Sequence, residues 1–440
     1  MSSKYIPIIG LEVHVELKTK SKMFCSCSAD YFGQKPNTHT CPVCLGLPGA
    51  LPVANMLAID WCIMIALALH CKINQFSKFD RKNYFYPDLA KSFQISQYDL
   101  PFGEKGSMEL KNGKKIGITR VHMEEDTGKL IHETINGEKV SLIDFNRSSV
   151  PLVEIVTDPD FHSAEEVVEY LQRLQRIVRY LEVSDADMEK GNMRLEPNIS
   201  LSVDGKTLPK YKVEVKNINS FRFVQKSIDF EIKRQEEILK TGKKPLQETR
   251  GWSEMKNETV SQRVKEEAND YRYFPEPDLP PIRMAKEQIS TLESSVPELQ
   301  EKKSNRFVTD FSLNSYDAEI LTREKNIADY FEEAVAVGKD YNVTPKQIAN
   351  VIINKKVNIE RILPAELIKD LIEGSRKVDI DVNELTVVIT NVLQDNQRAV
   401  EDYKSGKETV IMFLVGQVIK QIGKKIDATM VKDLLITQLK

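Results

Sequence analysis

The stretch Leu11-Glu-Val-His-Val-Glu-Leu17 alternates strictly between apolar and polar residues, which is typical of a β-strand with one buried face. Its apolar residues share one face, and Glu12, His14 and Glu16 project together from the other. Two carboxylates and an imidazole along one strand can bind a divalent cation, and carboxylate oxygens suit Mg²⁺. A solvated outer face of a sheet would show the same pattern, so this strand alone leaves the two interpretations balanced.

Two further segments carry carboxylates that a cation would stabilise. Residues 120–128 contain three consecutive acids, Glu125 among them, after a histidine. Glu154 lies inside the otherwise apolar run 150–156, and burying a carboxylate is costly without a cation or hydrogen-bond donors. An ion pair with Arg147 is the structural alternative for this glutamate.

The segment 210–216 alternates in the opposite sense, so that one face carries Lys210, Lys212, Glu214 and Lys216. Acidic residues beside a lysine-lined strand suit phosphoryl transfer, because a metal neutralises phosphate oxygens while lysines stabilise charge in the transition state. The sequence has no Walker motif and no glycine-rich kinase loop. An ATP site would therefore not be of a common type.

Four of the six cysteines form two close pairs, Cys25 with Cys27 and Cys41 with Cys44, separated by thirteen residues. In a reducing compartment this clustering favours a metal over disulfides, and four thiolates are the ligands of a tetrahedral structural zinc site. Buried thiols that merely pack are the alternative. The other two cysteines lie in an apolar helical run and are predicted to be core residues.

Two segments mix aromatic and charged residues more densely than an ordinary loop does, 78–88 and 270–275. We expect the first to form a wall of the active site, with a packed aromatic loop as the alternative. The aromatic residues of the second suit either a core or a base-stacking surface.

The 440 residues, 41% hydrophobic and 29% charged, predict a globular protein of two or three domains. The fold class is expected to be α+β, with a mixed-sheet domain at 1–288 that the proline-dense stretch 274–281 closes. Beyond it, helical patterns predict an all-α helical domain at 289–374 and a C-terminal helical tail domain at 375–440. Three helices are predicted within the first domain, at 56–69, from the capping box of Ser163 and Glu166 onward, and at 221–240.

The net charge of the chain and its lack of targeting signals limit its expected partners and its expected location in the cell. The formal net charge of −3 does not indicate nucleic-acid binding, so any tRNA contact must rely on local basic patches. No apolar run reaches the length of a membrane span and no secretory signal is visible, so we expect a cytoplasmic protein without a membrane partner.

Taken together, several long stretches resemble the B subunits of the heterotrimeric aspartyl/glutamyl-tRNA amidotransferases, which are related to the archaeal E-type subunit. They are IGLEVHVEL (9–17), FCSCS with CPVCLGLPG (24–49), KFDRKNYFYPD (78–88), HMEEDTGK (122–129), IDFNRSSVPLVEIVTDP (143–159), VEVKNINSFRFV (213–224), DYRYFPEPDLPP (270–281) and VEDYKSGK with FLVGQVIK (400–420). These motifs are peculiar to the family and extend over nearly the whole chain.

The resemblance implies a reaction, a cradle-shaped catalytic domain and partners. In the family, an amidase-type A subunit hydrolyses glutamine and sends ammonia through a tunnel, and a small C subunit completes the heterotrimer. The B subunit uses ATP and Mg²⁺ to phosphorylate the side-chain carboxylate of misacylated Glu-tRNA(Gln) or Asp-tRNA(Asn), and ammonia then displaces phosphate. The implied activity is that of a carbon–nitrogen ligase with glutamine as the amide-nitrogen donor.

The resemblance also implies roles for individual residues. The expected Mg²⁺ ligands are Glu12, His14, Glu125 and Glu154. The expected catalytic residues, near the tunnel exit and the ATP site, are Glu125, Glu154, Lys82, Lys91 and Tyr84. The residues expected to bind the nucleotide are Lys82, Asn146, Arg147, Asn198 and Lys216. The zinc knuckle that some members keep corresponds to Cys25, Cys27, Cys41 and Cys44.

The chain departs from the family pattern in three places. Ser149 stands where glycine or alanine is usual, and Lys190 replaces a frequent glutamate. Between residues 371 and 399 the chain is shorter than a usual member, and the helical and tail domains hold the tRNA in the family. The choice between the two tRNAs is therefore left open.

Two other functions compete with amidation. One is a zinc-bearing RNA-binding module without catalysis, and the other is a stand-alone ligase that acts on a free amino acid. The sequence carries no glutaminase signature, which favours ammonia from a partner subunit.

Overall fold

The computed structural model describes residues 4–264, 271–355, 357–375, 381–423 and 426–439. It has two compact units, Met1–Lys303 and Ser304–Lys440. The first unit contains all the strands and the second is helical, which confirms the predicted α+β class. Among the described residues, no helix combines the length and the apolar character needed to cross a membrane.

A nine-stranded sheet forms the centre of the first unit, in the order β14-β13-β12-β11-β1-β10-β7-β6-β2. In that order the strands are Glu258–Val264, Glu248–Ser253, Val213–Lys216, Met193–Ser202, Ile6–Glu16, Pro151–Thr157, Lys115–Glu125, Gly103–Glu109 and Lys72–Ile73. Neighbouring strands are antiparallel except β12 and β13, so the sheet is mixed, as predicted. The quoted alternating stretch lies in and just after β1, and its four apolar side chains are at most 2% exposed.

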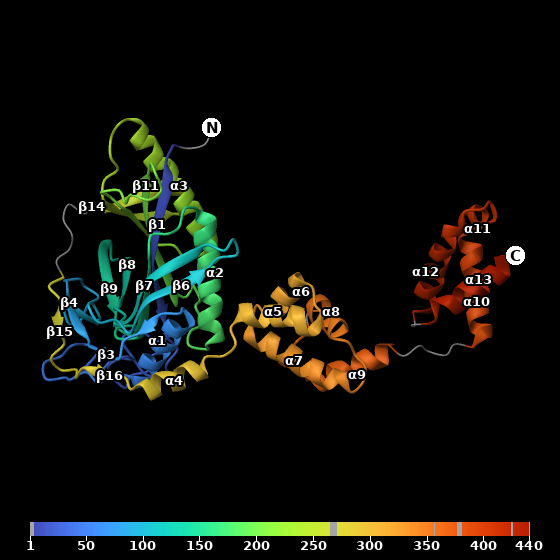
Figure 1. Cartoon of the computed structure of the whole chain (residues 1–440), viewed down its shortest axis with the longest axis horizontal. Helices are drawn as coiled ribbons and strands as arrows, with labels where there is room; N and C mark the ends of the chain where they lie inside the picture. The colour runs from blue at the N-terminus through green and yellow to red at the C-terminus, as the bar shows by residue number, and fades with distance from the viewer. Residues whose placement is uncertain (1–3, 265–270, 356, 376–380, 424–425, 440) are drawn as a thin grey trace. The chain divides into compact units, whose positions relative to one another are not determined.

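Helices cover one face of this sheet and bury its apolar side chains (Figure 1). They are α1 (Met56–Ala68), α2 (Ala164–Tyr180) and α3 (Phe221–Lys240), and α4 (Lys286–Ser295) packs against α1. Ser163 caps α2 by accepting a hydrogen bond from the backbone N–H of Glu166 at 3.3 Å, which confirms the predicted helix start. Because the helices occupy one face, the polar side chains of β1, β7, β10 and β11 are left on the other face.

Smaller sheets stand at the edges of the unit. A three-stranded sheet joins β15 (Phe274–Pro275) to β4 (Asp80–Asn83) and β5 (Phe93–Ser96), so the two aromatic segments singled out in the sequence lie side by side. The remaining strands are β3 (Phe76–Ser77) paired with β16 (Ile282–Arg283), and the exposed hairpin of β8 (Lys129–Ile135) and β9 (Glu138–Asp144).

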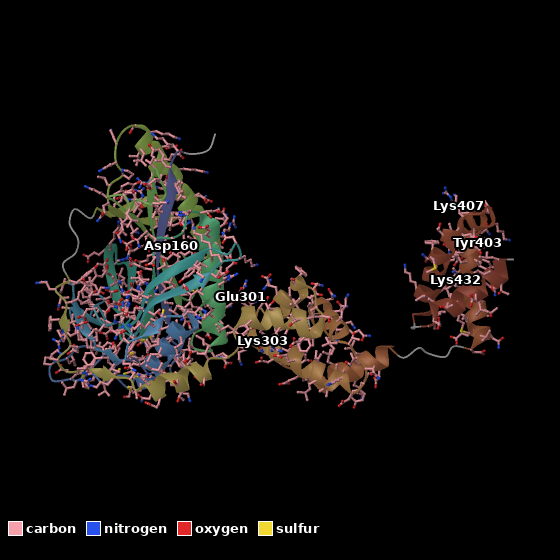
Figure 2. All side chains as sticks on the ribbon, in the orientation of Figure 1. Asp160, Glu301, Lys303, Tyr403, Lys407 and Lys432 are labelled. Carbon is pink, nitrogen blue, oxygen red and sulfur yellow. The ribbon has the colours of Figure 1, made fainter. Side chains whose placement is uncertain are left out.

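The second unit has two apolar clusters, each closed by its own helices. The first belongs to α5 (Gln300–Phe311), α6 (Ser315–Leu321), α7 (Lys325–Lys339), α8 (Pro345–Lys355) and α9 (Pro364–Ser375). The second belongs to α10 (Val382–Asp395), α11 (Gln397–Lys404), the 3₁₀ turn Glu408–Val410, α12 (Ile411–Ile422) and α13 (Ala428–Leu439). Tyr403, labelled in Figure 2, packs against this second cluster.

The domain limits at 288 and 374 stay predictions. The first compact unit extends to Lys303 because α4 packs against α1 and its residue Leu292 contacts the core of the sheet unit. The two helical clusters lie on either side of 376–380, a part of the second predicted boundary that is outside the described residues.

Candidate active site

Three adjacent strands bring a histidine and two carboxylates together on the polar face of the sheet. His14 in β1 is paired with Glu154 in β10, and Glu154 is paired with His122 in β7. The Nε2 atom of His14 lies 3.3 Å from Oε1 of Glu124 and 3.6 Å from Oε2 of Glu154. We call His14, Glu124 and Glu154 the triad; one ligand atom of each lies within 4.8 Å of the other two.

Glu124 and Glu154 are buried and His14 is partly buried, and the charges of the three side chains depend on one another. Burial alone would raise the pKa of Glu124, but the positive charge of Lys82 and the hydrogen bond with His14 hold it below its usual value. Burial alone would lower the pKa of His14, but hydrogen bonds to Glu124 and Glu154 outweigh it and raise this pKa to about 10. Without a metal, the triad therefore holds an imidazolium between two carboxylates at neutral pH.

A second group of carboxylates lies next to the triad across β1, β11 and β12. One carboxylate oxygen from each of Glu12, Glu196 and Glu214 lies within 4.8 Å of the others. Burial raises the pKa of Glu12, and the charges of Glu154 and Glu196 raise it further. The Nζ atom of Lys216 lies 2.9 Å from Oε2 of Glu196, and the charge of Lys212 also acts on Glu12. A bound divalent cation would relieve the remaining repulsion.

A pocket of about 500 Å³ opens beside these carboxylates. Its lining includes Gly10, Glu12, Thr157, Asn198, Lys210 and Lys212. The side-chain amide of Asn198 donates to Oε1 of Glu12 at 3.1 Å, but its buried Oδ1 accepts no hydrogen bond. Buried polar atoms are rarely left unpaired, so this oxygen indicates a missing donor from a bound molecule.

The small sheet of β4 and β5 forms a wall beside the triad. The Nζ atom of Lys82 lies 3.9 Å from Oε2 of Glu124, and the hydroxyl of Tyr84 donates to Oε1 of Gln94 at 3.3 Å. Lys91 instead contacts Glu125, with 2.6 Å between Nζ and Oε1. Burial is the main reason that the pKa of the Tyr84 phenol is raised.

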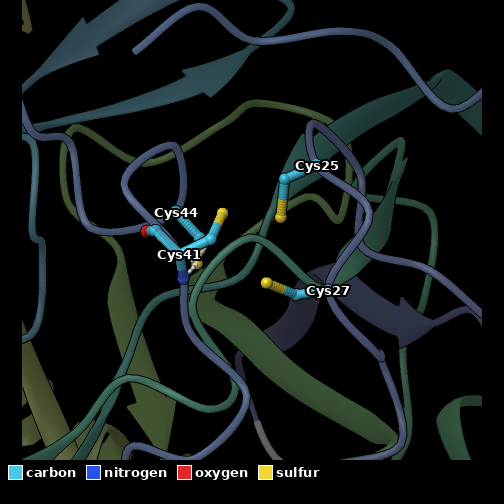
Figure 3. Close-up of side chains that lie close together, drawn as sticks. All are labelled: Cys25, Cys27, Cys41 and Cys44. Carbon is cyan, nitrogen blue, oxygen red and sulfur yellow. Dashed lines mark hydrogen bonds between the residues drawn. The ribbon is translucent and has the colours of Figure 1, made fainter.

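The four clustered cysteines converge in the loop between β1 and α1 (Figure 3). Their Sγ atoms all lie within 4.8 Å of one another. The backbone N–H of Cys41 donates to Sγ of Cys44 at 3.1 Å. A hydrogen bond from the Cys25 thiol, outweighing burial, lowers the pKa of Cys44 to about 5. Four sulfurs this close together are a donor set that could hold a structural zinc ion.

Comparison with known proteins assigns this arrangement to a family. A family model described as the GatB/GatE catalytic domain matches residues 7–290, and one described as the GatB domain matches 364–439. The chain belongs to the GatB/GatE family. Its similar relatives are named as the B subunit of aspartyl/glutamyl-tRNA(Asn/Gln) amidotransferase. Those of Carboxydothermus hydrogenoformans and Thermoanaerobacter pseudethanolicus are 43% and 44% identical over 481 and 480 residues.

These matches cover 99% of this chain and 99% of each relative. Because the alignments are longer than the 440 residues of this chain, they contain gaps in it. The shortening between residues 371 and 399 stays a prediction, because these comparisons do not locate the gaps.

The four residues expected to bind Mg²⁺ do not form one group among the described residues. His14 and Glu154 belong to the triad, and Glu12 belongs to the second carboxylate group. Glu125 points to the opposite side of β7, where the backbone N–H of Ile95 donates to its Oε1 at 2.9 Å. Successive residues of a strand project to opposite faces, so Glu124, and not Glu125, reaches the polar face.

The residues expected to bind the nucleotide are also divided. Asn198 lines the pocket and Lys216 contacts the second carboxylate group beside it. Asn146 is fully buried and holds the cysteine loop, since its Oδ1 accepts from the backbone N–H of His39 at 2.7 Å and its amide donates to the backbone oxygen of Lys35 at 2.7 Å. We therefore leave Asn146 out of the proposed nucleotide site.

Arg147 also has structural partners. Its Nε and Nη2 atoms donate to the backbone oxygens of Thr127 and Gly128 at 3.0 and 2.8 Å, and Nε lies 3.7 Å from Oδ1 of Asp126. These contacts close the base of the β8–β9 hairpin. The arginine does not pair with Glu154, which was the alternative considered from sequence; His122 and His14 stand beside that carboxylate.

Sequence reasoning assigned no ligand role to three acids of the site: Glu124, Glu196 and Glu214. The signal for Glu124 was present, because Val121 and Met123 are apolar and fix the buried face of β7. Glu214 had been placed on the polar face of 210–216, and Glu196 gave no signal. The grouping of both with Glu12 depends on the order of β1, β11 and β12 in the sheet.

Proposed function

We propose that this chain is the activating subunit of a glutamine-dependent tRNA amidotransferase, a carbon–nitrogen ligase. It phosphorylates the side-chain carboxylate of misacylated Glu-tRNA(Gln), Asp-tRNA(Asn) or both. A partner amidase subunit supplies ammonia, and a small third subunit completes a cytoplasmic heterotrimer. The observation that carries the proposal is the buried triad beside Lys82, in a member of the GatB/GatE family.

The donor sets fit Mg²⁺. His14, Glu124 and Glu154 would hold one ion, and the all-carboxylate group of Glu12, Glu196 and Glu214 suits a second hard cation. When bound, Mg²⁺ would neutralise phosphate oxygens during transfer.

The chain's own residues position the nucleotide and the acceptor. The pocket beside Asn198 takes the nucleotide, and Oδ1 of Asn198 accepts a hydrogen bond from it. Lys82, close to the triad, stabilises charge on the transferred group. The γ-phosphoryl group of ATP moves to a carboxylate oxygen, which leaves ADP and an acyl phosphate. The ammonia nitrogen then bonds to the acyl carbon, and phosphate departs with the C–O bond electrons.

Glu125 and Lys91 act from the other side of β7. Because Glu125 follows Glu124 directly, this ion pair stands next to the activation site but faces away from it. We assign it to the gate through which ammonia arrives.

One assay separates this proposal from its rivals. The chain assembled with its two partner subunits should convert Glu-tRNA(Gln) to Gln-tRNA(Gln) with ATP and Mg²⁺. A zinc-bearing RNA-binding module predicts tRNA binding without ATP consumption. A stand-alone ligase predicts turnover of free glutamate by the chain alone, and either result would reject the proposal.

Mg²⁺ binding is expected to release about one proton per chain at pH 7–8. The pKa of His14 is about 10 without a metal, so its imidazole is protonated below that pH and must lose the proton to become a ligand. Proton release should fade as the pH rises through about 10, and Mg²⁺ affinity should weaken as the pH falls. Calorimetric titration in buffers of different ionisation enthalpy measures the release. A binding heat that is independent of the buffer would contradict it, and His14→Gln is the matched control without the titrating group.

Asn198→Leu is expected to raise the KM for ATP about tenfold, the effect of losing one buried hydrogen bond to the ligand. The KM for tRNA should stay within about twofold of the original, since the pocket serves the nucleotide. Initial-rate measurements at varied ATP and varied tRNA test this. Ser253→Ala, at the end of β13, is a control outside the pocket.

A further inference from the structure

Four tyrosine rings from two distant segments form a continuous series beside the triad. Tyr98 and Tyr273 are stacked, with ring centroids 4.3 Å apart and an interplanar angle of 12°. Tyr271 meets Tyr273 edge to face at 6.0 Å, and Tyr84 meets Tyr271 at 5.9 Å. We call these four residues the tyrosine ladder. The β4–β15 pairing holds the two segments together, with a hydrogen bond of 2.9 Å from the backbone N–H of Asn83 to the backbone oxygen of Tyr271.

The inner end of the ladder lies at the activation site. The Nζ atom of Lys82 is 5.2 Å from the ring centroid of Tyr271 and 3.9 Å from Oε2 of Glu124. Burial raises the pKa of the Tyr273 phenol to about 12, against the charge of Lys82 and together with the charges of Glu124 and Glu154. Lys82 therefore links the inner end of the ladder to Glu124 of the triad.

The outer end of the ladder is open to solvent. The side chain of Tyr98 is 59% exposed although Tyr273 covers one face of its ring, so the other face is accessible. The backbone of Tyr98 is anchored to β4, because its N–H donates to Oδ2 of Asp80. Oδ1 of Asp80 is paired with Lys78. A ring that is stacked on one face and exposed on the other offers a flat aromatic surface to a further ring.

We propose that the exposed face of Tyr98 stacks the 3′-terminal nucleobase of the aminoacyl-tRNA while its amino-acid side chain reaches the triad. This inference rests on the proposed function. The amino acid is esterified to the terminal ribose, so a base platform must stand away from the triad by the length of the ribose and the amino acid. The ladder supplies this separation, with Tyr271 and Tyr273 between Lys82 and Tyr98.

The chemistry of the ligand suits this surface. The terminal nucleotide of a tRNA is unpaired, so both faces of its base are free to stack on an aromatic ring. Stacking depends little on sequence, which suits two tRNA substrates with the same 3′ end. The adenine of ATP is the competing base, but the pocket beside Asn198 lies over β1 and β11, away from the residues of the ladder.

The test uses the assembled amidotransferase and Glu-tRNA(Gln) whose terminal adenine is replaced by the fluorescent base 2-aminopurine. Stacking should quench the fluorescence on binding to the original protein, and Tyr98→Ala should abolish the quenching. Tyr98→Ala should also raise the KM for tRNA on the order of tenfold, with kcat and the KM for ATP within about twofold. Tyr98→Trp should keep both the quenching and the KM, because the stacking face is kept.

Phe32→Ala is the matched control, since Phe32 is 60% exposed on the same unit and lies outside the ladder. Quenching that persists in Tyr98→Ala, or a raised KM for ATP with an unchanged KM for tRNA, would overturn the stacking proposal. These results would leave the proposed function intact as long as the original protein amidates its substrate. Failure of the original protein to amidate would overturn the proposed function itself.

Discussion

Replacement of Glu154 by glutamine is expected to lower the rate of tRNA amidation by at least about 10³-fold, because it removes a charge from the centre of the site. The Glu154 carboxylate lies 3.6 Å from Nε2 of His14 and 3.2 Å from Nε2 of His122. Glutamine keeps the size of the side chain but brings an amide close to two imidazoles and weakens any bound cation. The measurement is single-turnover conversion of Glu-tRNA(Gln) at saturating ATP and Mg²⁺, together with glutamine hydrolysis by the partner subunit, which should survive at least in part.

Glu138→Gln is the matched control for this substitution. Glu138 lies at the exposed start of β9. Its substitution by glutamine makes the same change of charge outside the triad. Its amidation rate should stay within about twofold of the original. Near-normal amidation by Glu154→Gln would contradict the assignment of the triad to the active site, whatever the control shows.

The double substitution Cys41→Ser and Cys44→Ser is expected to abolish zinc binding and to lower the free energy of unfolding by roughly 2–5 kcal/mol, the scale of losing a native cross-link. The four sulfurs converge within one loop. In the double variant, neutral hydroxyls replace two of the four thiolates that would bind the metal. Metal analysis of the purified chain gives the zinc content, and denaturant unfolding gives the stability.

Cys62→Ala is the control for the zinc measurement. Cys62 is fully buried in α1 and its substitution should leave one zinc per chain, at the cost of a small cavity. An original protein purified without chelators and free of zinc would contradict the four-cysteine site.

The sequence was most informative where a local pattern decides the structure. Strict alternation in β1 placed His14 on the polar face, and the capping box at Ser163 placed the start of α2. The spacing of the two cysteine pairs was enough to bring four sulfurs together, because both pairs lie in one loop. These features depend on a few neighbouring residues and on short-range geometry.

The parts that could not be predicted depend on long-range arrangement. Glu124 is the exception, because the apolar Val121 and Met123 nearby already fix the phase of β7 that distinguishes it from Glu125. The second carboxylate group required the order of three strands, which no local pattern encodes. Asn146 was expected at the nucleotide because of its motif, and its hydrogen bonds to the cysteine loop became visible only in three dimensions.

The central place of β1 in the sheet affects how the chain is made on the ribosome. β1 leaves the exit tunnel well before its two neighbours, β10 and β11, which end only at Thr157 and Ser202. During synthesis, both edges of β1 and its apolar face therefore stay uncovered until β10 has been made. Such an exposed strand is prone to pair with other nascent chains, so we expect yields of this protein to depend on chaperones that bind the first 200 residues.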